Sequence, residues 1–173
     1  MSYAVFMGVS GSGKTTIARG AAAQLGWELL EGDAFHPPAN VEKMSHGIPL
    51  TDDDRWPWLR AIAAEVDRLR AEGKSAAVAC SALKRAYRDL LLGGHPDGIL
   101  VYLQGSPELI GRRMAARKGH FMPPKLLESQ FATLEPPGYD EQPVVVSIAP
   151  APEVIIDEVV RRLRQRMHAE PAA

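Results

Sequence analysis

The chain has 173 residues, a formal net charge of −1, and ordinary proportions of hydrophobic (46%) and charged (24%) residues. These values are typical of one soluble globular domain, which we expect over residues 1–168 with a frayed tail over 169–173. They argue against a nucleic-acid partner and a membrane-binding surface, and no apolar run is long enough to span a bilayer. The single cysteine, Cys80, excludes an intrachain disulfide and favours a reducing cytoplasm.

The first motif follows an apolar segment, residues 3–7, that we expect to be a buried strand. Residues 8–15 match the phosphate-binding pattern G-x-x-x-x-G-K-[ST], and a helix-forming stretch over 16–25 comes next. In this context glycines let backbone N–H groups turn toward phosphate oxygens at a helix N-terminus. The motif predicts a nucleoside triphosphate site; the alternative is an ordinary glycine-rich turn.

The predicted nucleotide-binding residues are this loop and the start of the helix after it. They are Gly8, Val9, Ser10, Gly11, Ser12, Gly13, Lys14, Thr15 and Thr16. We expect Lys14 to reach the β- and γ-phosphates and to be catalytic, and the Thr15 hydroxyl to bind Mg²⁺.

Beyond the loop, apolar strands alternate with helices. We expect strands over 27–31, 75–80, 98–103 and 144–148, and helices over 41–45, 52–72, 82–92, 107–117, 125–134 and 155–167. Thr51 is the expected N-cap of the helix over 52–72, and Gly73 is expected to end that helix. Apolar strands alternating with helices predict a parallel sheet covered on both faces. Right-handed crossovers should then bring Lys14, Asp33 and Ser81 together at one edge of the sheet.

Asp33 is the carboxylate that follows the expected second strand at this edge. It can accept a hydrogen bond from a substrate hydroxyl and orient it for in-line attack on the γ-phosphate. The alternative is that Asp33 caps a turn. The base-reading and switch motifs of GTP-dependent proteins, N-K-x-D and D-x-x-G, do not occur, and the third strand ends without the acidic residue of motor ATPases. These features favour a kinase.

Arg113 and Arg117 lie four residues apart, and therefore share a face of one expected helix. A segment containing Gly and Pro follows, so we expect a mobile lid over about 113–124 that brings both arginines to the nucleotide phosphates, with Arg117 catalytic, and that excludes water. The alternative is a solvated basic helix end.

A second basic pair, Lys84 and Arg88, lies on the helix that we expect Ser81 to cap. A helix N-terminus with two cations is suited to a small carboxylate, so Ser81, Lys84 and Arg88 are predicted to bind the acid group of the acceptor. His36 and Arg55 are expected to contribute to the same pocket. The alternative is a surface basic pair that balances Asp89.

Several segments together resemble the small P-loop gluconate kinases. They are residues 32–37, 40–44, 47–50, 52–59, 80–89, 117–122 and 127–135. The resemblance implies a three-layer α/β P-loop kinase fold, related to that of shikimate and nucleoside-monophosphate kinases, with a five-stranded parallel sheet in the order 2-3-1-4-5. It also implies a substrate-binding insertion near 34–72.

The activity that this resemblance implies is transfer of the γ-phosphate of ATP to the 6-hydroxyl of D-gluconate, which gives 6-phosphogluconate. ATP and Mg²⁺ are the implied cofactors, and a homodimer is the implied assembly because members of the family are commonly dimeric. Two other functions stay open from the residues: a kinase for a shikimate-like acid or a nucleoside monophosphate, and a nucleotide-dependent switch ATPase.

Overall fold

The computed structural model describes residues 2–116 and 124–168. The expected tail over 169–173 and the middle of the expected lid, including Arg117, lie outside the described residues. In the part of the chain that is described, no helix combines the length and the apolar character that a bilayer crossing requires.

A five-stranded parallel sheet forms the middle layer, in the order β2-β3-β1-β4-β5. The strands are β1 (Tyr3–Met7), β2 (Glu28–Glu31), β3 (Ala76–Ala79), β4 (Gly98–Gln104) and β5 (Val144–Ser147). Every residue of the central strand β1 is buried, because helices cover both faces of the sheet and leave no strand face for water. The predicted fold class and strand order are confirmed.

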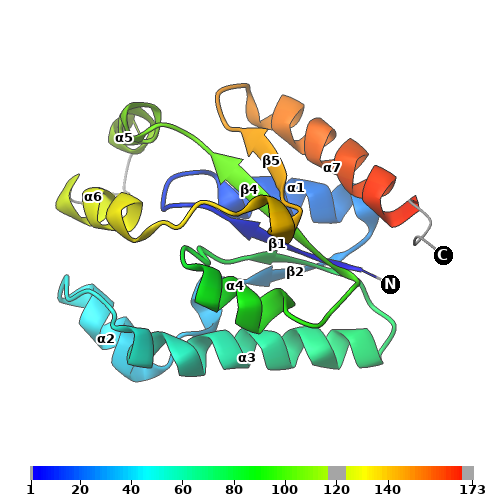
Figure 1. Ribbon diagram of the computed structural model, residues 1–173. Helices are drawn as coiled ribbons and strands as arrows, with labels where there is room; N and C mark the ends of the chain where they lie inside the picture. Colours follow the sequence, from blue (N-terminus) through cyan, green and yellow to red (C-terminus); the bar gives the residue numbers. More distant parts are fainter. Residues whose placement is uncertain (1, 117–123, 169–173) are drawn as a thin grey trace.

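Helices form the two outer layers (Figure 1). α1 (Lys14–Leu25) packs against α7 (Pro152–His168) on one face, and α3 (Asp52–Ala71) packs against α4 (Arg85–Leu92) on the other. Three further helices, α2 (Pro38–Ser45), α5 (Pro107–Ala116) and α6 (Pro124–Thr133), lie at the end of the sheet where β1 passes into α1. The carboxyl end of the parallel sheet is therefore surrounded by helices from three separate parts of the sequence.

The start of α3 is fixed by the capping residue that the sequence predicts. Thr51 and Asp54 form a capping box, in which the Asp54 N–H donates to Thr51 Oγ1 at 3.2 Å and the Thr51 N–H donates to Asp54 Oδ2 at 2.9 Å. Lys43 of α2 donates to the same carboxylate oxygen at 2.7 Å, and Asn40 Nδ2 donates to the Asp54 carbonyl at 2.8 Å. These bonds fasten α2 to the start of α3.

The connection from β3 to α4 differs from its prediction. α4 begins at Arg85 rather than at Ala82, and its N-cap residue is Lys84. Ala82 has a φ of 43°, in the left-handed region, which a right-handed helix does not include. The prediction that Ser81 caps this helix is therefore wrong, and residues 81–84 form a connecting loop. The other elements begin and end close to their predicted positions.

Candidate active site

The loop between β1 and α1 is shaped to receive an anion. Gly11 and Gly13 have φ values of 82° and 92°, and a Cβ atom on Gly11 would lie 2.6 Å from Cγ of Met114. Within residues 2–116 and 124–168, the backbone N–H groups of Gly11, Gly13, Lys14, Thr15 and Thr16, where this loop joins α1, donate no hydrogen bond. These N–H groups, which we call the phosphate cradle, are at the N-terminus of α1, where the helix dipole favours negative charge.

Lys14 folds back over this loop. Its Nζ donates to the carbonyl oxygens of Gly8 at 2.9 Å and Val9 at 3.0 Å. Burial lowers the pKa of Lys14 to about 8, and the nearby Asp33 carboxylate opposes this shift. The lysine charge is thus held beside the phosphate cradle.

Thr15 contacts an acidic residue that the sequence reasoning missed. Its Oγ1 donates to Glu31 Oε2 at 2.9 Å, and the buried Oε1 has no hydrogen-bond partner among the described residues. The Arg19 Nη2 is 3.6 Å from Glu31 Oε1. A hydroxyl and a carboxylate are oxygen donors of the kind that Mg²⁺ prefers beside phosphates. The position of Glu31 at the end of β2, the strand that precedes Asp33, was the available signal.

A pocket of about 460 Å³ opens beside the phosphate loop. Polar side chains from five separate segments reach it: Ser10, Lys14, Asp33, His36, Arg55, Ser81, Ser129, Gln130 and Thr133. Its mouth carries exposed apolar residues of α2 and of the loop after it, Val41, Met44 and Ile48. The structure thus brings Lys14, Asp33 and Ser81 together, and adds His36 and Arg55 to the same pocket.

Trp58 organises one wall of this pocket. Its Nε1 donates to the Gly32 carbonyl at 2.7 Å, which fixes the backbone directly before Asp33. Its ring stacks on His36, with centroids 4.2 Å apart and planes 16° from parallel. Burial lowers the pKa of His36; Arg55 acts in the same direction and Asp33 opposes. A neutral imidazole can offer either a donor or an acceptor to a substrate hydroxyl.

Arg55 supplies a cation on another wall of the pocket. Its Nη1 donates to the Tyr87 hydroxyl at 2.9 Å, and the Asp52 carboxylate is 3.9 Å away. A guanidinium has five N–H donors in a planar fork, so most of the donors of Arg55 remain for a ligand.

Arg88 does not line the pocket, which differs from its predicted position. Only 1% of it is exposed, and its Nε and Nη2 donate to the two carboxylate oxygens of Glu141 at 2.7 and 3.1 Å. Nη1 donates to the carbonyls of Ala82 and Leu83, each at 3.1 Å. These partners hold the loop after β3 and leave no accessible charge for a substrate.

Lys84 is also absent from the pocket lining. Its Nζ donates to Asp52 Oδ1 at 3.1 Å, in an adjoining shallow depression that shares Leu50, Arg55 and Thr133 with the pocket. The prediction assumed that Lys84 and Arg88 share one face of a helix. Because Lys84 is the N-cap residue, with ψ of 147°, the helical spacing does not apply to it.

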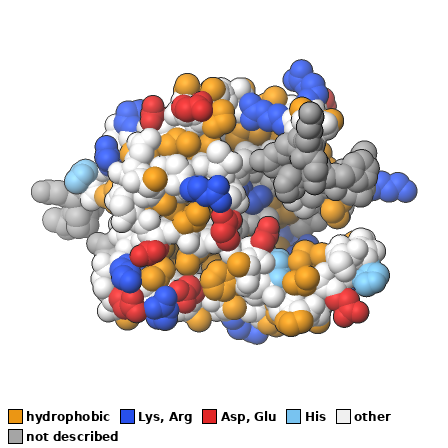
Figure 2. All heavy atoms as spheres, turned by 180° about the vertical axis from the view of Figure 1, so that it is seen from behind, with side chains coloured by type: hydrophobic (Ala, Val, Ile, Leu, Met, Phe, Trp, Pro, Cys, Tyr) orange, Lys and Arg blue, Asp and Glu red, His pale blue; other side chains and the backbone are white. Residues whose placement is uncertain are grey.

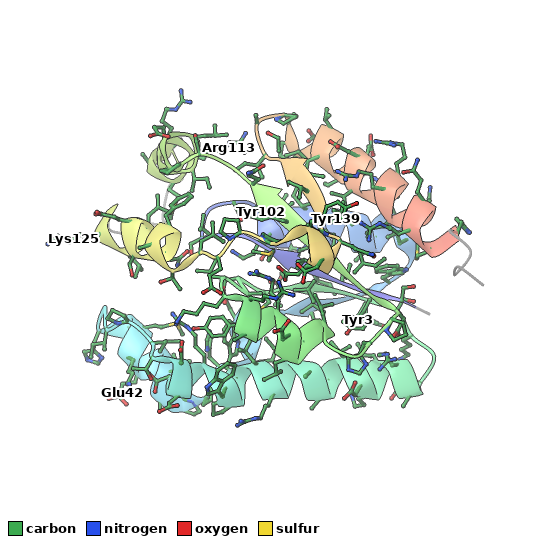
Figure 3. All side chains as sticks on the ribbon, viewed as in Figure 1. Tyr3, Glu42, Tyr102, Arg113, Lys125 and Tyr139 are labelled. Carbon is green, nitrogen blue, oxygen red and sulfur yellow. The ribbon has the colours of Figure 1, made fainter. Side chains whose placement is uncertain are left out.

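Arg113 is a partly buried residue of α5, labelled in Figure 3. Its Nη2 donates to the carbonyl of Ala149, in the connection between β5 and α7. It does not line the pocket described above. Its contact with nucleotide phosphates stays a prediction, as does the lid, whose second arginine, Arg117, is outside the described residues.

Comparison with known proteins identifies the family of this chain. A family model described as an AAA domain matches residues 4–137. The gluconokinase of Gluconobacter oxydans (strain 621H) is 49% identical over 162 residues, which cover 94% of this chain and 91% of that protein. This chain is an AAA-domain protein of the gluconokinase family.

Solved structures of similar proteins support the assignment. A sugar kinase from Janibacter sp. HTCC2649, in an unliganded structure, is 49% identical with a TM-score of 0.88, and the match covers 95% of each chain. A gluconokinase from Sinorhizobium meliloti 1021 is 45% identical with a TM-score of 0.86, over 95% of this chain and 92% of that one. A shikimate kinase from Bacteroides thetaiotaomicron, at 18% identity and a TM-score of 0.65, shares the fold. This member of the gluconokinase family thus has the P-loop kinase fold.

Proposed function

We propose that this protein transfers the γ-phosphate of ATP to the 6-hydroxyl of D-gluconate. The observation that carries the proposal is the single pocket that Lys14, Asp33 and Arg55 share beside the phosphate loop. This arrangement offers a cation for the phosphates, a carboxylate for an acceptor hydroxyl and a second cation for an acid group. Membership of the gluconokinase family supports gluconate as that acceptor.

The triphosphate of ATP fits the phosphate cradle, where the unpaired N–H groups replace water around its oxygens. Lys14 would then exchange the carbonyls of Gly8 and Val9 for phosphate oxygens. The Thr15 hydroxyl and the Glu31 carboxylate would hold Mg²⁺, which neutralises the charge on the phosphates. These groups bind and orient the donor.

The acceptor hydroxyl would lie against Asp33. Its oxygen attacks the γ-phosphorus, the bond from that phosphorus to the bridging oxygen of ADP breaks, and the hydroxyl proton passes to the Asp33 carboxylate. The products are 6-phosphogluconate and ADP, and the proton then leaves to solvent.

The carboxylate of gluconate is assigned to Arg55, since Arg88 is buried in an ion pair and Lys84 is outside the pocket. A planar guanidinium can hold a carboxylate through two parallel hydrogen bonds. His36 and Ser81 line the same pocket and are assigned to hydroxyl groups along the sugar chain. A neutral sugar would leave Arg55 without an anionic partner, which disfavours its binding.

A cytoplasmic location and a homodimeric assembly complete the proposal. The buried free thiol of Cys80 supports a reducing compartment. The assembly can be measured directly by light scattering during size-exclusion chromatography, which distinguishes one chain of 18.8 kDa from two.

A coupled assay of ADP release tests the proposed function. The acceptor panel contains D-gluconate, shikimate, a nucleoside monophosphate and the neutral sugar D-glucose, with ATP and Mg²⁺ in every reaction. We expect turnover that depends on gluconate and is at least about 100-fold slower with the other compounds. If turnover with shikimate or the nucleoside monophosphate equals turnover with gluconate, gluconate is not the specific acceptor. ADP release without any acceptor would favour a switch ATPase.

A further inference from the structure

Gln130 of α6 contacts the phosphate loop through both atoms of its side-chain amide. Its Oε1 accepts the backbone N–H of Ser10 at 2.6 Å, and its Nε2 donates to Ser10 Oγ at 2.8 Å. The two residues are 120 positions apart in the sequence. A paired contact of this kind fixes both the distance and the orientation of α6 relative to the loop.

The N–H group that Gln130 occupies is outside the phosphate cradle. The cradle begins at Gly11, one residue after Ser10, and its N–H groups have no partner in the described parts of the chain. Gln130 therefore leaves the anion-binding donors available. The contact holds the edge of the loop, where the loop meets the acceptor pocket.

The remainder of α6 forms a wall of that pocket. Leu126, Ser129 and Thr133 line it together with Gln130. At the end of the helix, the Glu135 N–H donates to the Leu83 carbonyl at 2.8 Å, which fastens the chain after α6 to the loop after β3. The wall is thus held at its end by residue 135 and at its phosphate side by Gln130.

We propose that Gln130 is a positioning residue that keeps this wall in register with the phosphate loop. A hydroxyl of the acceptor lying along α6 is thereby placed against the γ-phosphate, and water is kept out of the space between them. This inference rests on the proposed kinase function, and it adds a residue of α6 to the reaction. Small errors in the alignment of two reactants cost large factors in rate, so this contact should matter to transfer.

The first test compares Gln130→Ala with the wild type and with Gln24→Ala. Gln24 also joins two elements, since its Nε2 donates to Asp157 of α7 at 3.1 Å, but it is exposed and far from the pocket. We expect Gln130→Ala to lower kcat about tenfold and to raise the KM for gluconate about tenfold, with the Kd for ATP changed less than about twofold. Gln24→Ala should match the wild type in all three.

The same reactions report on the exclusion of water. When water attacks the γ-phosphorus instead of the acceptor, the bond to ADP breaks and inorganic phosphate, ADP and a proton are released. The ratio of inorganic phosphate to phosphorylated acceptor should rise at least about fivefold in Gln130→Ala. Unchanged kinetics and an unchanged ratio would overturn the inference. Tighter ATP binding would also overturn it, because it would mean that Gln130 competes with the phosphates.

Ser10→Ala changes the other partner of the same contact. It removes the hydroxyl but keeps the backbone N–H, so it should reduce transfer by a smaller factor than Gln130→Ala. The double variant should be no worse than Gln130→Ala alone, because both changes break one contact. Losses that multiply in the double variant would contradict the proposed coupling. If the wild type does not phosphorylate gluconate, the proposed function fails. The kinetics of the same variants are then measured with whichever acceptor in the panel the wild type does phosphorylate.

Discussion

Arg88 of α4 and Glu141 of the short 3-10 turn before β5 form a buried ion pair, with Arg88 Nε 2.7 Å from Glu141 Oε1. Burial alone would raise the pKa of Glu141, but hydrogen bonds from Arg88 and from the Gly138 N–H lower it. Because Arg88 also holds the carbonyls of Ala82 and Leu83, the pair fixes the loop that carries Ser81 to the pocket. We therefore expect the pair to stabilise the site.

The first prediction concerns the stability that this pair provides. Arg88→Ala leaves the Glu141 carboxylate buried without its cation, so the free energy of unfolding should fall by about 3–5 kcal/mol. The matched control is Arg85→Ala, which removes an exposed ion pair with Asp140 and should cost less than about 1 kcal/mol. Urea unfolding measures both. If the Arg88→Ala protein is stable and only its KM for gluconate is raised, Arg88 binds the substrate and the expectation is contradicted.

The second prediction follows from the lowered pKa of Lys14, which is about 8. ATP should bind the protonated lysine, so its affinity is expected to be constant well below pH 8 and to weaken about tenfold by pH 9, with uptake of a proton on binding. Calorimetry in two buffers of different ionisation enthalpy measures the affinity and the proton uptake. Lys14→Arg keeps its charge at this pH and should show no such dependence, whereas a flat wild-type profile would contradict the expectation.

The third prediction concerns Glu31 and Mg²⁺. Glu31→Gln keeps the shape of the side chain but removes its charge, so Mn²⁺, used as a spectroscopic probe of the Mg²⁺ site, should bind the ATP complex about tenfold more weakly. Electron paramagnetic resonance measures the free Mn²⁺. Glu28→Gln, an exposed position at the other end of β2, is the control. Equal Mn²⁺ affinity in the wild type and Glu31→Gln would limit Glu31 to its hydrogen bond with Thr15.

The fourth prediction assigns the acid group of the acceptor to Arg55. Arg55→Ala should raise the KM for gluconate by about tenfold to 100-fold, the loss of a charged hydrogen bond of about 1.5–3 kcal/mol, with little change in the KM for ATP. Arg55→Lys should recover only part of this loss, because an ammonium cannot reproduce the planar fork. Steady-state kinetics with each substrate varied in turn measures both constants. An unchanged KM for gluconate would mean that Arg55 does not bind the carboxylate of gluconate.

The fold could be predicted from the sequence because its signals are local. Thr51 followed by Asp54 forms a capping box from residues three apart, and the apolar strands repeat between helices with no interruption. The glycine loop likewise depends on its own residues and the two elements that flank it. The convergence of Lys14, Asp33 and Ser81 then followed from the topology of a parallel sheet.

The errors occurred where a residue's role depends on partners distant in sequence. Arg88 is buried because Glu141, 53 residues further along, reaches it, and nothing near Arg88 in the sequence indicates this. The helix prediction at Ala82 failed because its left-handed backbone is imposed by the surrounding structure, although alanine itself favours helices. Gln130 gave no local sign of its contact with Ser10, 120 residues away.

The most direct test of the account is the rate of phosphoryl transfer in Asp33→Asn. The substitution keeps the shape of the side chain and removes the charge that accepts the hydroxyl proton. We predict that gluconate-dependent kcat falls at least about 100-fold, while the Kd for ATP with Mg²⁺ stays within about twofold of the wild type. A collapse of ATP affinity with kcat preserved would contradict the account, and would make Asp33 part of the nucleotide or metal site.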